Sequence, residues 1–301
     1  MRQIALRLKE LGIKYLESIE IKRYTTIRIG GIAGILTFPE NAGEVLKVFE
    51  LCKENGVPCY VLGGGSKVLI GDGFIKGVFV VTKDMQRFDV LETDDEVARL
   101  NLGAGVGINK VVSWGMRFGY KGLEFLAGIP ATIGGSIKMN AGAFGKEVKR
   151  LVRRIKLLKG NEIIELENKE EFWDYRRFKL DGVIVEAELE LRKESSERIK
   201  DEVIKGINLR KKKQPFTKAT FGSIFKNPEG DFAGRLIEAA GLKGKTCGEA
   251  RISPVHANFI ENLGNARAED VLRLMKEAVE RVFKLFGIVL EPEVNLIGCE
   301  I

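Results

Sequence analysis

The sequence predicts a fold that mixes α-helices and β-strands and divides into two or three domains. The chain has 301 residues, whereas a domain holds roughly 100 to 200. A β-α-β pattern occupies residues 32–62, and from Val152 onward apolar and polar residues alternate as they do in antiparallel strands. These observations together predict ordered structure that contains both parallel and antiparallel strands.

The first third of the chain is predicted to begin with a helix and to continue as the β-α-β unit. Charged and apolar residues follow helical spacing through the first twenty positions, which predicts an N-terminal helix. A strand is predicted over 32–38, a helix over 42–55 and a strand over 58–62. The last strand runs directly into a loop of three glycines, Gly63 to Gly65.

The rest of the chain is predicted to be mainly sheet and then mainly helix. A charged stretch over 192–200 is the predicted boundary between these parts, and Gly287 is the predicted stop of the last helix. No internal repeat is present. Strands are predicted at 77–81, 88–92, 98–102, 152–159, 162–167 and 182–191, and helices at 109–118, 197–213, 232–240 and 268–286.

Composition narrows the class of protein. Hydrophobic residues make up 45% and charged residues 30%, which is typical of folded globular proteins. The N-terminus lacks the apolar core of a signal peptide, and no stretch offers 18 uncharged apolar residues. Four cysteines without a CxxC pair favour a reduced compartment, and a single histidine, His256, excludes a His-rich metal site. The net charge of +7 is compatible with nucleic acid, membrane surfaces or phosphorylated small molecules.

Two glycine clusters predict a phosphate-binding site. Glycines after a strand adopt positive φ without a Cβ clash, so the N–H groups of Gly63 to Gly65 can converge on an anion, and Ser66 adds a hydroxyl. The second cluster, residues 128–147, is suited to a diphosphate and a ribityl chain. No GxGxxG segment opens a helix, and Ala239 stands where a P-loop ending in Gly244-Lys245-Thr246 needs its first glycine, so neither a Rossmann fold nor a P-loop is indicated. Ordinary tight turns are the alternative interpretation of each cluster.

Several strings occur in an order typical of one enzyme family: GGGSKVLI, GAGVGINKVVSW, GLEFLAGIPATIGGSIKMNAGAFGKE, GSIFKNP, AGRLIEAAGLKG, SPVHANFIEN and EPEV. Together they resemble the UDP-N-acetylenolpyruvoylglucosamine reductase family, whose members use FAD and NADPH in peptidoglycan synthesis. The resemblance covers roughly Tyr24 to Gly298. It is closest to the shorter branch of the family, which lacks the extra substrate-closing insertion.

The resemblance implies an α+β fold with three parts. Two subdomains, residues 1–75 and 76–195, would form an FAD-binding fold of the vanillyl-alcohol-oxidase (PCMH) type, and residues 196–301 would form an α+β substrate-binding domain. It further implies a cytoplasmic enzyme that takes a UDP-sugar enolpyruvyl ether, with no nucleic acid, membrane insertion, metal or obligate protein partner.

The same resemblance implies non-covalent FAD, with NADPH as co-substrate. The family usually has Asn after GGGS, where this chain has Lys67, whose cation could contact a phosphate or point outward. The residues that match the family's FAD-binding motifs are Arg28, Gly30, Gly63, Gly64, Gly65, Ser66, Gly128, Ile129, Pro130, Thr132, Gly134, Gly135, Ser136, Asn140 and Gly142.

Three residues match the family's catalytic positions. The implied reaction adds a hydride from FAD to the β-carbon and a proton to the α-carbon of the enolpyruvyl ether, through an enol-like dianion. Arg176 would bind the carboxylate that gains charge, Ser223 would donate the proton, and Glu293 would polarise the carboxyl group or the intermediate. The pattern around Arg176 is two residues short, so Arg177 is the alternative.

The substrate-binding residues implied by the resemblance are Tyr175, Lys213, Lys226 and Asn227. His256 is interpreted as structural. Two other functions are considered: a flavin-dependent oxidase or dehydrogenase of alcohols or sugars, and a nucleic-acid-binding protein prompted by the basic run 210–213. The only histidine lies far from the flavin motifs, and no nucleic-acid-binding module is present.

Overall fold

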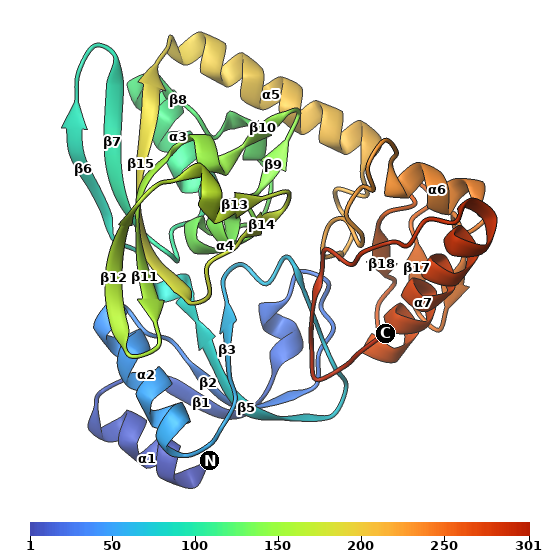
Figure 1. Ribbon diagram of the computed structural model, residues 1–301, viewed down its shortest axis with the longest axis horizontal. Coiled ribbons are helices and arrows are strands. Elements are labelled where there is room, and N and C mark those ends of the chain that lie inside the picture. Colours follow the sequence, from blue (N-terminus) through green and yellow to red (C-terminus); the bar gives the residue numbers. More distant parts are fainter. The chain divides into compact units, whose positions relative to one another are not determined.

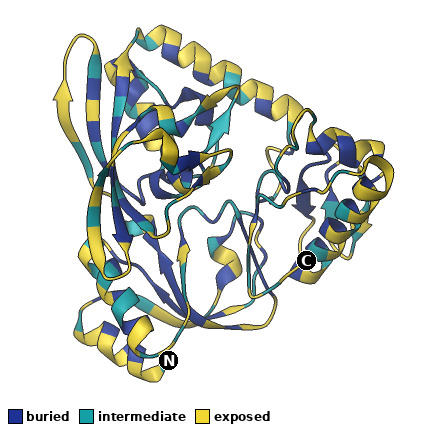
Figure 2. Ribbon diagram, viewed as in Figure 1, coloured by how far each residue is buried: buried dark blue, intermediate teal, exposed yellow.

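The computed structural model describes residues 1–301, which divide into two compact units (Figure 1). The first unit contains Met1–Glu17, Gly34–Gly64 and Lys76–Asn208. The second contains Ser18–Ala33, Gly65–Ile75 and Leu209–Ile301. Each unit buries its own apolar clusters, as the dark blue segments of Figure 2 show.

A four-stranded sheet contains the predicted β-α-β unit. Its strand order is β1 (Tyr15–Glu20), β2 (Ile32–Thr37), β5 (Phe74–Val81) and β3 (Cys59–Leu62), with β3 and β5 parallel. Helix α2 (Ala42–Glu54) connects β2 to β3, and its first turn is capped by the Asn41 side chain, which accepts from the Glu44 N–H at 3.0 Å. The β-α-β prediction is therefore confirmed.

Helices α1 (Arg2–Glu10) and α2 share one apolar cluster with this sheet. Ile4 of α1, Val45 of α2 and Val78 of β5 are fully buried in it. Burial of such aliphatic side chains contributes about 1.5–3 kcal/mol each.

A six-stranded sheet forms most of the first unit, and its strands are antiparallel, as the alternating pattern predicted. Helix α3 (Ile108–Phe118) packs into the apolar cluster formed by the strands of this six-stranded sheet, and it ends at Gly119, which adopts the left-handed conformation. The strands run in the order β12 (Glu162–Glu167), β11 (Val152–Lys159), β15 (Val183–Lys193), β7 (Val97–Gly103) and β6 (Phe88–Thr93), while β8 (Tyr120–Lys121) pairs with β15.

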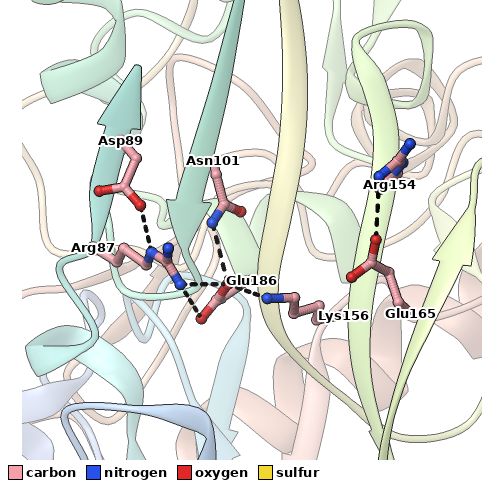
Figure 3. A network of polar contacts seen from close by, with 7 residues as sticks. All are labelled: Arg87, Asp89, Asn101, Arg154, Lys156, Glu165 and Glu186. Carbon is pink, nitrogen blue, oxygen red and sulfur yellow. Dashed lines mark hydrogen bonds and ion pairs between the residues drawn. The ribbon is translucent and has the colours of Figure 1, made fainter. Parts of the chain in front are cut away.

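One face of this sheet carries a network of charged side chains (Figure 3). Glu186 on β15 accepts hydrogen bonds from Lys156 at 3.1 Å, Asn101 at 3.3 Å and Arg87 at 3.4 Å. Because successive strand residues point to opposite faces, Ala187 and Leu189 of the same strand are buried in the core. The alternation that predicts the strands thus separates the core from the charged face.

The second unit is built around α7 (Ala268–Phe286). This helix ends at Gly287 with φ +69°, as predicted, and its buried residues Val271 and Met275 share a cluster with α6 (Ala233–Ala239). A parallel pair, β4 (Val68–Ile70) and β19 (Asn295–Ile297), and an antiparallel sheet, β16 (Thr246–Cys247), β17 (Ala250–Ile252) and β18 (Ile260–Asn262), complete the unit.

The remaining elements are short, apart from α5 (Ser196–Lys213), which lies at the predicted position. They are α4 (Ile133–Lys138), the pairs β9 (Gly142–Ala143) with β10 (Lys146–Glu147) and β13 (Trp173–Asp174) with β14 (Arg177–Phe178), and 3₁₀ helices over Ile21–Tyr24, Thr82–Asp84, Glu124–Leu126, Val148–Arg150 and Glu170–Phe172.

The N-terminal prediction was wrong in its length. Helix α1 ends at Glu10, and the chain re-enters the sheet as β1. Gly12 adopts φ +71°, and the Ile13 N–H donates to the Leu8 carbonyl at 3.0 Å while the Gly12 N–H donates to the Lys9 carbonyl at 3.1 Å. This Schellman arrangement ends the helix, although charged and apolar residues continue at helical spacing beyond it.

Candidate active site

The glycine loop after β3 lies directly against the second glycine cluster within the first unit. A Cβ on Gly64 would lie 2.4 Å from the Pro130 carbonyl oxygen, and one on Gly63 would lie 2.6 Å from Thr132 Oγ1. A side chain at either position would force the two segments apart, so only glycine permits this approach.

The rest of the loop belongs to the second unit, where it is joined to residues 24–30. Gly65 has φ +64°, and a Cβ there would lie 1.9 Å from the Tyr24 carbonyl oxygen. Its own carbonyl accepts from the Thr26 N–H at 2.9 Å. Arg28 (φ +58°) and Gly30 (φ +145°) follow in unusual backbone conformations. Two predicted cofactor segments are therefore hydrogen-bonded to each other.

The second cluster buries two polar atoms that have no partner in the protein. Thr132 caps α4, because its Oγ1 accepts from the Gly135 N–H at 3.4 Å. Ser136 Oγ and Asn140 Oδ1 are buried without a hydrogen bond, although the Asn140 amide nitrogen donates to the Asp174 carbonyl at 3.0 Å. Buried polar atoms nearly always find a partner. A ligand rich in hydrogen-bonding atoms, such as the dinucleotide that the resemblance implies, fits this need.

Close packing fixes the other residues of the cluster. The Gly128 N–H donates to Asn109 Oδ1 at 2.9 Å, and a Cβ on Gly134 would lie 2.8 Å from the Ala104 Cβ. Glycine at these positions lets the segment follow the surrounding backbone closely. Ser66, Ile129, Gly135 and Gly142 are half-buried, and Pro130 is exposed.

Arg176 lies in a strained turn beside the second cluster. Its φ is +56°, its Nη1 lies 3.5 Å from the Asn140 carbonyl oxygen, and its guanidinium stacks on the exposed ring of Tyr175 at 4.9 Å. Positive φ is uncommon for non-glycine residues and concentrates at functional sites. Arg177, the alternative from the sequence, is exposed on β14 opposite Asp174. The turn thus brings Arg176, not Arg177, to the glycine cluster.

Ser223 and Glu293 lie on neighbouring segments of the second unit. The Glu293 N–H donates to the Ile224 carbonyl at 2.8 Å, and the Lys226 N–H donates to the Glu291 carbonyl at 2.9 Å. The segment 223–226 therefore runs beside 291–293, so the fold brings these two predicted catalytic residues together although 70 positions separate them in the sequence.

Lys67 connects the same two segments through its side chain. Its ammonium donates to the Ser223 carbonyl at 2.7 Å and pairs with Glu293 Oε1 at 2.9 Å. The Glu293 side chain is only 10% exposed and that of Lys67 23%. Sequence reasoning considered a phosphate contact or an outward orientation for Lys67. It did not foresee this contact with two catalytic candidates, because nothing local in GGGSK points to residues so far along the chain.

The residues that are predicted to contact the substrate differ in their exposure and in their partners within the protein. The Lys226 ammonium lies 2.5 Å from Glu291 Oε1, and Asn227 Oδ1 accepts from the Ala233 N–H at 3.1 Å at the start of α6. Lys213 is exposed at the end of α5. Asn227 is exposed, and its amide nitrogen carries two further hydrogen-bond donors.

Asn258 was not singled out in the sequence, although it lies in the string SPVHANFIEN. Its buried side chain donates to the Phe225 carbonyl at 2.8 Å and accepts from the Phe225 N–H at 2.9 Å, which fixes the segment 223–226. Nδ1 of His256 accepts from the Asn258 N–H at 3.2 Å, and burial lowers the pKa of His256. These contacts agree with a structural role for the histidine.

No three His, Cys, Asp or Glu side chains are grouped so that they could hold a metal ion. None of the helices combines the length and the apolar character that crossing a membrane requires.

Comparisons with known proteins cover nearly the whole chain. Residues 33–165 match the model of an FAD binding domain, and residues 214–297 match that of the UDP-N-acetylenolpyruvoylglucosamine reductase C-terminal domain. Reductases of that name from Syntrophus aciditrophicus and Rubrobacter xylanophilus are each 39% identical, over 92% of this chain and 90% and 93% of theirs. The crystal structure of the Thermus caldophilus enzyme superposes with a TM-score of 0.79 at 32% identity, over 95% of this chain and 98% of that one. The chain therefore belongs to the UDP-N-acetylenolpyruvoylglucosamine reductase family.

Proposed function

We propose that this protein reduces UDP-N-acetyl-3-O-(1-carboxyvinyl)glucosamine to UDP-N-acetylmuramate for peptidoglycan synthesis, with NADPH as co-substrate. The observation that carries the proposal is the match, over 92% of the chain, to reductases of this name. The enzyme is an FAD-containing oxidoreductase, because residues 33–165 form an FAD binding domain.

We propose that the two glycine segments hold FAD. The buried, unpartnered Ser136 Oγ and Asn140 Oδ1 support this assignment, since FAD offers hydrogen-bonding partners for both. When bound, FAD supplies the hydride for the substrate. The proposed contacts are Arg28, Gly30, Gly63, Gly64, Gly65, Ser66, Gly128, Ile129, Pro130, Thr132, Gly134, Gly135, Ser136, Asn140 and Gly142.

We assign three roles in the reduction of the enolpyruvyl ether. The planar guanidinium of Arg176 binds the substrate carboxylate, on which charge accumulates as the double bond is reduced. Ser223 gives its hydroxyl proton to the α-carbon. Glu293 polarises the substrate carboxyl group or the intermediate. The strained turn at Arg176 and the pairing of segments 223–226 and 291–293 support these roles.

The sugar nucleotide would be held by Tyr175, Lys213, Lys226 and Asn227. Cationic ammonium groups and amide donors suit diphosphate oxygens. Lys226 is paired with the exposed Glu291, so a diphosphate would replace that carboxylate as its partner.

We further propose the division into FAD-binding subdomains over 1–75 and 76–195 and a substrate-binding domain over 196–301. Arg176 would then come from an FAD-binding subdomain, and Ser223 and Glu293 from the substrate-binding domain. We also propose that the enzyme works in the cytoplasm, where NADPH is produced, with no nucleic acid and no obligate protein partner.

The visible spectrum of the purified protein tests this function. A bound flavin band is expected, which NADPH bleaches without oxygen and which the enolpyruvyl substrate then restores. Alcohols and sugars serve as controls for the oxidase alternative. The substrate of such an enzyme reduces flavin, so these compounds should not bleach the oxidised band. A colourless protein that takes up no added FAD would refute the proposal.

A further inference from the structure

We infer that Lys67 is a positioning residue for the reduction. Its side chain holds the Glu293 carboxylate and the segment that contains Ser223 in fixed positions relative to each other. The inference rests on the proposed function of these two residues. The Lys67 ammonium contacts both residues: it lies 2.7 Å from the Ser223 carbonyl oxygen and 2.9 Å from Glu293 Oε1.

The base of the Lys67 side chain is fixed by the backbone on both sides. Gly65 precedes it in the tight turn against Tyr24, and β4 follows it in parallel pairing with β19. The Lys67 carbonyl accepts from the Asn295 N–H at 3.0 Å. The segment that contains Glu293 is thus tied to Lys67 twice, once through Asn295 and once through the ion pair.

The far end of the Lys67 side chain lies against Gly222. A Cβ on Gly222 would lie 3.7 Å from Lys67 Nζ, which is ordinary contact, and Gly222 itself has φ +78°. The ammonium therefore rests on the turn that presents Ser223. A flexible lysine held at both ends in this way has a defined position, whereas an exposed lysine does not.

The charge of Lys67 matches the chemistry assigned to its neighbours. Ser223 acquires negative charge when it gives up its proton, and the Glu293 carboxylate is already negative in a largely buried place. The Lys67 ammonium bonds to the Glu293 carboxylate and to the backbone carbonyl of Ser223, so it keeps Glu293 in one orientation and places a positive charge on the segment that contains Ser223. If Lys67 is removed, the carboxylate stays buried without its partner and is free to turn away.

The test compares Lys67→Met with Lys243→Met in the flavin-loaded full-length protein. Lys243 forms an ion pair with Glu238 at 2.8 Å in the same unit, outside the site, and is the matched control. In Lys67→Met, NADPH should reduce the flavin at the wild-type rate, while reoxidation by the enolpyruvyl substrate should slow by about 100-fold, the loss typical of a misplaced catalytic group. Lys243→Met should change neither rate.

Two further variants separate positioning from general stability. Lys67→Arg, which keeps the charge, should retain reoxidation within about tenfold of wild type; that limit is about 1.4 kcal/mol of activation free energy. In a Glu293→Gln background, Lys67→Met should cause a smaller additional loss than in the wild-type background, because the part of its effect that acts through Glu293 is already gone. Wild-type reoxidation rates in Lys67→Met, or losses that multiply in the double variant, would overturn the inference.

Two controls, on the folding of Lys67→Met and on the turnover of the wild-type protein, separate failure of this inference from failure of the proposed function. If Lys67→Met does not fold, Lys67→Arg decides the question, and a loss of 100-fold or more in that variant would contradict the inference. Failure of the wild-type protein to be reoxidised by the enolpyruvyl substrate would instead refute the proposed function. Normal wild-type turnover with an unaffected Lys67→Met would refute only the role of Lys67.

Discussion

At the residue scale, the second glycine cluster contains two polar side-chain atoms that have no hydrogen-bond partner in the protein. Ser136 and Asn140 are both buried, yet Ser136 Oγ and Asn140 Oδ1 bond to nothing in the protein. Asn140 also has φ +38°, a conformation that costs free energy in a non-glycine residue. Both features are understandable if this segment folds around a ligand, because the ligand then satisfies the atoms and stabilises the turn.

Replacing Ser136 by Ala should separate cofactor binding from folding. The variant loses one hydrogen bond to FAD, worth about 0.5–1.5 kcal/mol, so the FAD dissociation constant should rise by roughly 2- to 12-fold. The unfolding temperature of the FAD-free protein should stay the same or rise, since the hydroxyl has no protein partner to lose.

Flavin fluorescence titration and thermal unfolding measure these two quantities. Ser113→Ala, at an exposed position of α3, is the control and should alter neither. An unchanged FAD affinity in Ser136→Ala, or a marked loss of stability without FAD, would contradict the assignment of this segment to the cofactor.

Some site residues could be predicted at this scale and others could not. Gly63 and Gly64 were identifiable because clustered glycine is a local signal, and their close approach to Pro130 and Thr132 explains why no other residue would fit. The sequence favoured Arg176 with Arg177 as the alternative, and in the structure the backbone turn places Arg176, not Arg177, beside the glycine cluster. The contacts of Lys67 needed the structure, because its partners lie on distant segments.

At the scale of elements, the charged face of the six-stranded sheet stabilises strands that are otherwise held by their apolar face. Burial by itself would raise the pKa of Glu186, but hydrogen bonds from Lys156 and Asn101 and the charges of Lys156 and Arg87 outweigh it and lower that pKa. A carboxylate with a lowered pKa contributes stability above its unfolded pKa of about 4.3, and this contribution is lost as the pH falls through the folded pKa.

Glu186→Gln should therefore destabilise the protein in a pH-dependent way. At neutral pH the free energy of unfolding should fall by about 1–2 kcal/mol, because three donors lose their charged acceptor. The difference from wild type should shrink as the pH falls below the unfolded pKa of about 4.3 and through the lowered folded pKa, where the folded wild-type carboxyl group also becomes neutral.

Urea unfolding at several pH values measures this difference. Glu165→Gln is the control, since the side chain of Glu165 is 50% exposed and its one ion pair, with Arg154, is 3.4 Å long (Figure 3). Its effect should stay within about 0.5 kcal/mol. A pH-independent loss in Glu186→Gln would show that its charge is not what stabilises the sheet.

Elements with long regular patterns were predictable, and those set by a local turn were not. The alternation in β15 fixed both its type and its buried face, and Gly287 marked the end of α7. Helix α1 ended early because a Schellman turn at Gly12 interrupts an apparently helical pattern. Helix α4 was not predicted within the second glycine cluster, where glycine lowers helix propensity and the Thr132 cap offsets part of that cost.

At the scale of the whole molecule, the residues with proposed catalytic roles are distributed over the two compact units. Arg176 belongs to the first unit, and Ser223 with Glu293 belongs to the second. The sequence indicated these residues only through family motifs, because composition and periodicity carry no information about contacts between remote segments. From the glycine clusters alone, a phosphate-bearing ligand could be predicted, but the reaction could not.

The decisive measurement is the conversion of the enolpyruvyl ether by the purified protein. NADPH oxidation by the FAD-loaded protein is followed without oxygen while the nucleotide sugar is analysed by mass spectrometry. We expect that NADPH beyond the one equivalent that reduces the bound flavin is consumed only when the enolpyruvyl substrate is present, with one UDP-N-acetylmuramate formed for each further NADPH oxidised. Further oxidation of NADPH without formation of that product, or equal rates with and without the enolpyruvyl substrate, would contradict the proposed function.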